Sequence, residues 1–429
     1  MSRAVVRSYL SSGWVAIGAA IACSGGSTAG GPHGGAGAAG AAGARVVAAG
    51  APGVAGAASA GGGAVGAGAS AAGGSGEAAS AAAGGLGGAG GAALAGQGGA
   101  LAGGAAGASG AATASGSGGE LLSYPPASSE HRAIGTHDPS VIHVANSYYL
   151  FGTGGLLGVR SSKNLAQWSN AGSIFSALPA WIKSALGQTI SDLWAPDVSY
   201  VAGTYRVYYS GSTFGSNHSV IGLATNTTLD PADPTYKWVD QGLVIESNPA
   251  GSKDDWNAID PNVTTDAAGN WWLVFGSFWS GIKLRRLDTA TGKPSSADTT
   301  LYALAAHSGG IEAPSIISHN GYYYLFVSYD ACCKGVDSTY RTMVGRASAI
   351  TGPYTDKNGK AMLQGNAVQL LAKDGRYIGP GGGSAFRDGN LYYYAYHYYD
   401  GQMNGASELM LRPINWQNDW PELAAPLWQ

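Results

Sequence analysis

Short runs of apolar and aromatic residues, separated by polar turns, fill the chain from about Leu122 to its end. In the clearest example, residues 311–326, an acid and a proline lead into an apolar run, which His-Asn-Gly separates from Tyr-Tyr-Tyr-Leu-Phe. Asn-Gly between two such runs is a strong local signal for a β-hairpin. The pattern therefore predicts two antiparallel strands in this segment.

The same arrangement of proline, strand, turn and aromatic strand occurs five times. Proline suits the start of a strand, where its missing N–H breaks no ladder hydrogen bond. Repeats of this length are typical of β-propellers, whose blades have four short strands each. We therefore predict an all-β fold, a five-bladed β-propeller whose blade openings meet near one end of the axis, with a helical turn or two at 180–186. The five prolines, separated by 57, 65, 53 and 66 residues, are Pro139, Pro196, Pro261, Pro314 and Pro380.

The first part of the chain has a different composition. Most of the 71 glycines of the 429-residue chain precede residue 120, and residues 24–120 consist almost wholly of Gly, Ala and Ser. Such a segment cannot bury enough apolar surface to offset the entropy lost on ordering. We expect a disordered, flexible tether at 24–120 and the propeller domain at 121–429.

Residues 1–23 have the layout of a signal peptide, with two arginines followed by an apolar run that is too short to span a membrane. Ala-Ile-Ala-Cys at 20–23 resembles the lipobox of bacterial lipoproteins, in which the cysteine is acylated. Ordinary secretion with cleavage nearby is the alternative. Both interpretations predict export, and the first adds a lipid anchor at Cys23.

Composition excludes several other functions. The net charge is −3 and no basic stripe is present, which argues against nucleic acid as a partner. The glycine-rich stretch 379–383 lacks the following helix that a dinucleotide site needs. Apart from Cys23, the only cysteines are the adjacent Cys332 and Cys333, which either close a small ring or remain free thiols. We expect a monomer whose fold does not depend on disulfides that connect distant strands.

Three of the five blade openings carry an acid in register beside the proline: Asp138, Asp260 and Glu312. Two carboxyl groups that flank a glycosidic bond, one protonated and one ionised, suffice for hydrolysis. A third nearby carboxylate raises the pKa of the acid, because like charges resist joint ionisation. A single acid before proline more often caps a turn. Three in one aromatic-rich, exported chain instead favour a catalytic pocket on the propeller axis.

These motifs resemble glycoside hydrolase family 43, and within it the endo-1,5-α-L-arabinanases. The similarity covers about residues 131–429, and residues 330–340 are similar to a stretch typical of the arabinanase branch. The resemblance implies an arabinan polysaccharide as substrate. The motifs that carry it are 137–140, 192–197, 257–261, 276–282 and 311–314.

The resemblance also implies a role for each acid: Asp138 as general base, Glu312 as general acid and Asp260 as modulator of its pKa. The family inverts the anomeric carbon, so the base and the acid are expected about 6.5–9.5 Å apart. His397 is implied to help hold a hydrated metal ion, commonly calcium, on the axis. The chain departs from the family at Gly382, where relatives usually have histidine.

Trp194 and Phe214 are the expected sugar-stacking residues, because furanose rings present apolar C–H faces to aromatic side chains. Packing between blades is the alternative for Trp194. Asn257 and Ser277, which lie in the matching motifs, complete the expected substrate-binding set.

Other functions remain open from the sequence. Within the same family, an exo-acting α-L-arabinofuranosidase or a β-xylosidase would share the three acids. A propeller lectin that binds arabinan without cutting it would share the aromatic residues but would have no reason to keep the acids.

Overall fold

The computed structural model describes residues 133–428 of the chain. The signal peptide with Cys23, the tether at 24–120 and the start of the catalytic domain near residue 121 lie outside the described residues. The described part contains one short α-helix, α1 (Ala180–Leu186), and two 3-10 helices, η1 (Gly335–Asp337) and η2 (Met362–Gln364). None of these helices is long and apolar enough to cross a membrane.

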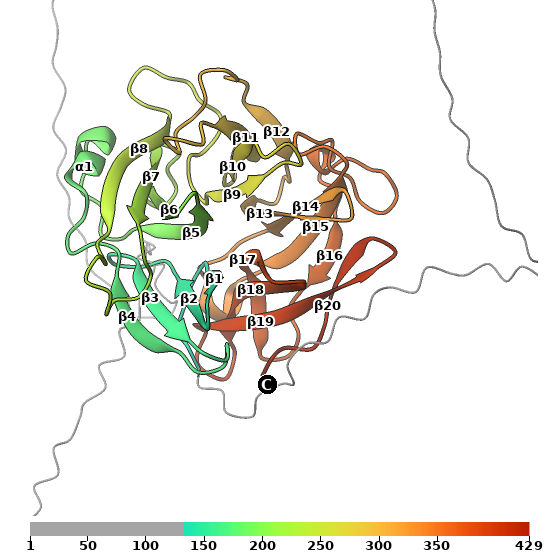
Figure 1. Cartoon of the computed structure of the whole chain (residues 1–429). Helices are drawn as coiled ribbons and strands as arrows, with labels where there is room; N and C mark the ends of the chain where they lie inside the picture. The colour runs from blue at the N-terminus through green and yellow to red at the C-terminus, as the bar shows by residue number, and fades with distance from the viewer. Residues whose placement is uncertain (1–132, 429) are drawn as a thin grey trace, which may run out of the picture. The chain divides into compact units, whose positions relative to one another are not determined.

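Twenty strands form five antiparallel sheets of four strands each, in which strands that follow one another in sequence are neighbours. Figure 1 shows the sheets arranged in a ring, with the first strand of each sheet nearest the centre. The predicted five-bladed β-propeller is confirmed. The strands of blade 1 are β1 (Ser140–Val144), β2 (Ser147–Phe151), β3 (Gly158–Ser162) and β4 (Ser169–Ser173); of blade 2, β5 (Trp194–Val201), β6 (Thr204–Gly211), β7 (Ser219–Asn226) and β8 (Val239–Ser247); of blade 3, β9 (Asn262–Thr265), β10 (Trp271–Phe275), β11 (Ile282–Leu287) and β12 (Tyr302–Ala305); of blade 4, β13 (Ile311–His319), β14 (Tyr322–Tyr329), β15 (Arg341–Ala347) and β16 (Val368–Leu371); and of blade 5, β17 (Tyr377–Asp388), β18 (Leu391–Asp400), β19 (Ala406–Gln417) and β20 (Trp420–Leu423).

The aromatic second strand of each blade is buried on both faces. In β6, β14 and β18 every residue after the first is buried, without the alternation of a half-exposed strand. This follows from the architecture, because each blade packs between two others. The apolar cores accordingly lie between blades: one cluster joins side chains of blades 1 and 2, and another joins those of blades 3 and 4.

Each blade opens with one residue in the left-handed backbone region, whose N–H is bonded to a side chain of the preceding blade. Aspartate and glycine tolerate this region better than most residues. Two details of the sequence prediction are therefore wrong. The fifth opening is at Gly382, two residues beyond Pro380, and Glu312 stands one residue before its opening position rather than in register with the other two acids. The five residues are Asp138 (φ 47°), Ala195 (φ 42°), Asp260 (φ 57°), Ala313 (φ 51°) and Gly382 (φ 58°).

Below these openings, a polar side chain of each first strand reaches the backbone of a neighbouring blade's first strand. The contacts form a closed ring of five, so each blade is tied to both neighbours around the axis. A net contribution of about 0.5–1.5 kcal/mol is typical of one such hydrogen bond. The contacts are Val198 N–H to Ser140 Oγ (3.1 Å), Val263 N–H to Asp197 Oδ2 (2.8 Å), Ile316 N–H to Asn262 Oδ1 (2.9 Å), Ala385 N–H to Ser315 Oγ (3.0 Å) and Ser384 Oγ–H to Pro139 O (2.7 Å).

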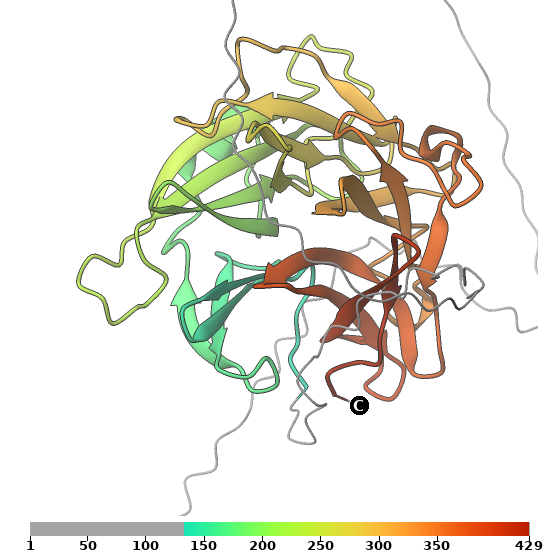
Figure 2. The ribbon, with the colours of Figure 1, turned by 45° about the vertical axis from the view of Figure 1, so that its right-hand side comes forward.

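Blade 5 closes the ring with segments from both ends of the described chain. Gly135 forms a β-bridge with Glu408 of β19, and Leu409 donates its N–H to Ile134 O at 2.9 Å. The other end of β19 pairs with β20 near the C-terminus. Figure 2 shows blade 5 (red) between blade 4 (orange) and blade 1 (teal).

Candidate active site

Asp138, the expected base, lies at the opening of blade 1 with 19 % of its side chain exposed. Its Oδ2 accepts hydrogen bonds from His137 Nδ1 (2.8 Å) and Thr153 Oγ1 (2.6 Å). Burial raises the pKa of Asp138, but His137, His397 and Thr153 outweigh burial and lower the pKa to about 2. The carboxylate is therefore ionised at neutral pH, as a general base must be.

Glu312, the expected acid, lies on β13 and is buried, with 7 % of the residue exposed. Ser277 Oγ donates to its Oε2 at 2.6 Å, and Tyr340 Oη donates to its Oε1. Burial raises the pKa of Glu312, and the charge of Asp138 adds to that effect against the two hydrogen bonds. A carboxyl group with a raised pKa keeps its proton to higher pH, which is the property a general acid requires.

Asp260 connects the blade 3 opening to the strand that carries Glu312. Its Oδ2 accepts the N–H of Ala313 at 3.0 Å, and its own N–H donates to Ser210 Oγ at 3.0 Å. Burial raises the pKa of Asp260 well above the usual range, and the charges of Glu312 and Asp138 raise it further. The three acids therefore share one electrostatic environment, in which only some of them can be ionised together.

His397, on β18, is fully buried and stacks on His137 with 3.7 Å between ring centroids. Its Nδ1 accepts the N–H of Asp138 at 3.2 Å, while Nε2 has no hydrogen-bond partner within the described residues. Burial lowers the pKa of His397 well below the usual range, so the ring is neutral and carries its proton on Nε2. A protonated Nε2 cannot ligate a metal directly, but it can donate to a water on a hydrated ion. The residues thus fit a hydrated cation held through water, and such an ion would add positive charge near the carboxylates.

Gly382, where the chain departs from the family pattern, lies against the base and His397. Its φ of 58° is in the left-handed region, and a Cβ placed there would lie 2.5 Å from Asp138 Oδ1 and 2.6 Å from His397 Nδ1. Any side chain would therefore force the base or His397 to move. In this chain, glycine lets the backbone of blade 5 approach the base.

The four expected substrate-binding residues occupy different environments. Trp194 is partly exposed and directly precedes Ala195, whose N–H donates to Thr153 Oγ1 beside the base. Phe214, in the loop between β6 and β7, is 72 % exposed. Asn257 is buried three residues before Asp260, and its Oδ1 has no hydrogen-bond partner within residues 133–428. A buried acceptor without a partner is unusual in a folded protein, and the expected contact of Asn257 with substrate remains a prediction.

Ser277 is buried, and its Oγ donates a hydrogen bond to Glu312. The structure therefore places it behind the acid, and its expected contact with substrate remains a prediction.

Three further residues touch the acids but were given no role from sequence. His137 and Tyr340 lie inside motifs that carry the family resemblance, which was the available signal. For Thr153 the sequence held no such signal, because only folding brings this residue to Asp138.

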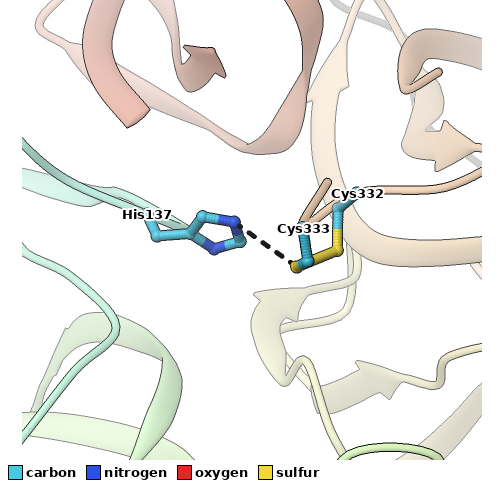
Figure 3. A group of neighbouring side chains, drawn as sticks. All are labelled: His137, Cys332 and Cys333. Atoms are coloured by element: carbon cyan, nitrogen blue, oxygen red, sulfur yellow. Dashed lines mark hydrogen bonds between the residues drawn. A yellow bond between two sulfur atoms is a disulfide. The ribbon is translucent and has the colours of Figure 1, made fainter. Parts of the chain in front are cut away.

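The adjacent cysteines form a disulfide, which settles the alternative left open by the sequence. Figure 3 shows the disulfide facing the imidazole of His137, with Cys333 Sγ 3.8 Å from His137 Nε2. The cysteines therefore belong to the surroundings of the base.

At its blade openings, this five-bladed propeller brings together an ionised aspartate, a glutamic acid with a raised pKa and a third carboxyl group. This arrangement defines the class of protein: a glycoside hydrolase that works through paired carboxyl groups. Residues 133–421 match the glycosyl hydrolases family 43, and the chain belongs to this family.

Its relatives include an extracellular endo-α-(1→5)-L-arabinanase of Bacillus subtilis, 44 % identical over 293 residues that cover 66 % of this chain and 86 % of the relative. An extracellular exo-α-(1→5)-L-arabinofuranosidase of Cellvibrio japonicus is 37 % identical over 68 % of this chain and 87 % of the relative. A solved structure of the Cellvibrio cellulosa α-L-arabinanase in complex with arabinohexaose aligns with a TM-score of 0.66 and 37 % identity, covering 68 % of this chain and 96 % of that one.

Proposed function

We propose that this protein is an inverting endo-1,5-α-L-arabinanase, which hydrolyses internal α-1,5-L-arabinofuranosidic bonds of arabinan. The observation that carries the proposal is the opposite shift of two neighbouring carboxyl pKa values, low at Asp138 and raised at Glu312. The arabinanase relatives supply the substrate class. A lectin would gain nothing from this arrangement, since binding a neutral sugar does not require one ionised and one protonated carboxyl group.

Asp138, oriented by His137 and Thr153, removes a proton from a water molecule that attacks the anomeric carbon. Glu312 donates its proton to the glycosidic oxygen as the bond from carbon to oxygen breaks. One sugar chain leaves with the new hydroxyl, and the other leaves with the proton from Glu312. Exchange with solvent then returns Asp138 to the ionised form and Glu312 to the protonated form.

The stereochemistry of the first product tests this mechanism. A single displacement by water inverts the anomeric carbon, so an α-linked arabinan should release the β-anomer first. Proton NMR within the first minutes, before mutarotation, distinguishes the anomers. An α-anomer as first product would indicate a covalent intermediate and would exclude Asp138 as a simple base.

Endo action is proposed over exo action because the endo-acting relative is the more similar of the two, at 44 % against 37 % identity. On debranched linear arabinan, an endo enzyme should release a mixture of oligosaccharides from the earliest time points. A single short product throughout the reaction would instead establish the exo alternative.

Export of the protein is supported by the relatives, which are named extracellular, and by the signal-peptide layout of residues 1–23. We further propose acylation at Cys23, on the lipobox-like sequence alone. Metabolic labelling with a fatty acid, compared between the wild type and Cys23→Ala, tests the anchor separately from the enzyme activity.

A further inference from the structure

The segment 330–340, between β14 and β15, is the part of the arabinanase-like sequence that the mechanism above leaves largely unused. It is cross-linked to itself. Ala331 and Thr339 are joined by two hydrogen bonds, Thr339 N–H to Ala331 O (2.9 Å) and Ala331 N–H to Thr339 Oγ1 (3.1 Å). Lys334 N–H donates to Ser338 Oγ at 3.0 Å. Movement at one end of this short segment is therefore transmitted to the other.

The segment reaches the acid at one end and the surroundings of the base at the other. At its last residue, Tyr340 Oη donates to Glu312. Near its start, Cys333 N–H donates to Tyr399 Oη at 2.8 Å, and Tyr399 Oη shares a second hydrogen bond of 2.8 Å with His137 Nε2. His137 Nδ1 in turn donates to Asp138. A continuous chain of hydrogen bonds thus joins the backbone of Cys333 to the base.

The disulfide lies at the point where this chain begins. It ties the side chains of two adjacent residues into a small ring that includes their shared peptide, which limits how the Cys333 N–H can turn. The disulfide also contacts the imidazole, with 3.8 Å between Cys333 Sγ and His137 Nε2 (Figure 3). Both sulfur-bearing residues are partly exposed, so a small reductant can reach them.

We propose that the Cys332–Cys333 disulfide is a redox-sensitive positioning element, which holds Tyr399 and His137 so that His137 orients the catalytic base Asp138. Its reduction takes two electrons and two protons and gives two thiols; a dithiol reductant is oxidised to its own disulfide in the same step. The two side chains then rotate independently, and the Cys333 N–H and sulfur no longer have fixed places beside Tyr399 and His137.

A shift of the pH profile is expected because the pKa of Asp138 depends on this support. Four titratable groups face Asp138: His137 and His397 lower its pKa, while the charge of Asp138 itself raises the pKa of Asp260 and Glu312. If His137 moves away, the pKa of Asp138 rises. The base must be ionised, so the acidic limb of the profile for kcat/KM moves to higher pH.

The test compares oxidised and reduced wild type on linear arabinan, with thiol titration to verify reduction, and so rests on the proposed function. We expect reduction to lower kcat about tenfold, the effect of weakening one hydrogen bond to a charged group. KM should change by less than about twofold, since the segment acts on a catalytic group. The acidic limb should move to higher pH, and reoxidation should restore both properties. An inactive untreated enzyme would refute the proposed function instead.

Variants separate positioning from stability. Cys332→Ser/Cys333→Ser should match reduced wild type and should not respond to reductant. Tyr399→Phe should also shift the acidic limb, because it removes the hydroxyl that links Cys333 to His137. Lys334→Ala, a matched control that removes an exposed side chain of the same segment, should behave as wild type in both redox states.

A second readout does not require arabinan. Burial lowers the pKa of His137, but the Asp138 carboxylate outweighs burial and keeps the pKa raised. On reduction, NMR titration of His137, assigned with His137→Gln, should show this pKa fall. The proposal would be overturned by a reduced wild type in which two thiols are titrated but nothing else changes. In that case the acidic limb and the His137 titration would be the same as in the oxidised form, and kcat would lie within twofold of it.

Discussion

At the scale of single residues, the site depends on what surrounds each carboxyl group. Asp138 is supported by hydrogen-bond donors and imidazoles, whereas Glu312 and Asp260 are buried close to other negative charge. Chemically similar side chains thereby acquire different protonation states, as base and acid catalysis at one pH requires.

Replacing either member of the catalytic pair should remove most activity. Asp138→Ala and Glu312→Ala are each expected to lower kcat by about 10²–10⁴-fold, the usual contribution of a general acid or base. Binding of arabino-oligosaccharides, measured by calorimetry, should persist. An aryl arabino-oligosaccharide with a good leaving group should partly rescue Glu312→Ala but not Asp138→Ala. Activity within threefold of wild type in either variant would refute these roles.

Asp260→Asn should displace the alkaline limb of the pH profile. The acid must be protonated, so the rate falls as pH rises through the pKa of Glu312. The charge of Glu312 raises the pKa of Asp260, and because such coupling is mutual, removing the ionisable group at 260 should lower the pKa of Glu312. The alkaline limb of kcat/KM should therefore move to lower pH while the acidic limb stays in place. Movement of the acidic limb alone would contradict this coupling.

At the scale of elements, the first strands depend on the ring of polar contacts described above. Asp197, on β5, is the only member of that ring with a carboxyl group, and it also accepts a hydrogen bond from Asn262 Nδ2 at 2.8 Å. Burial raises the pKa of Asp197 to about 7, and the hydrogen bonds from Val263 and Asn262 only partly oppose that effect. One strand contact is therefore sensitive to pH.

The sign of that sensitivity follows from linkage. A carboxyl group whose pKa is higher in the folded than in the unfolded state stabilises the fold below its unfolded pKa of about 4 and loses this contribution as pH rises through about 7. The loss is at most about 4 kcal/mol. Thermal melts from pH 4 to 8 should show a smaller decline for Asp197→Asn than for wild type. The exposed control Asp374→Asn should retain the wild-type decline, and equal slopes in all three proteins would contradict the assignment.

At the scale of the whole molecule, the base and His397 lie where the last blade meets the first. Asp138 opens blade 1 and its N–H is bonded to His397 of blade 5, so a cation held through water on His397 would also strengthen the closure of the ring. Segments from both ends of the described chain already complete that blade. Stability is therefore the property in which such an ion should be seen most directly.

Calcium added to chelator-treated protein should raise the melting temperature. A ligand that binds only the folded state stabilises it by about 2.7 kcal/mol at a hundredfold excess over its dissociation constant. His397→Ala should remove most of the calcium-dependent increase, because it deletes the Nε2–H expected to face a water on the ion. The anomer released should not change. An identical melting temperature with and without calcium in the wild type would refute the ion.

The amino-acid sequence by itself determined the repeat and the position of the acids along the chain. Proline, apolar run, turn and aromatic run recur because every blade needs the same buried second strand, and this local pattern can be read without the fold. The same reasoning misplaced the fifth opening at Pro380. Gly379, directly before Pro380, is left-handed as well, and only the hydrogen bond from Gly382 N–H to Ser328 Oγ of blade 4 places the opening at Gly382.

Tertiary structure alone decided which groups support the acids. Thr153 and Tyr340 reach Asp138 and Glu312 through the folding of their own blades, and Tyr399 reaches His137 only where closure of the ring joins blade 5 to blade 1. The same closure made the opposite pKa shifts of Asp138 and Glu312, because burial and neighbouring charge are properties of the folded surroundings rather than of the residue type. It also placed the Cys332–Cys333 disulfide against His137, a contact between two blades that no local pattern contains.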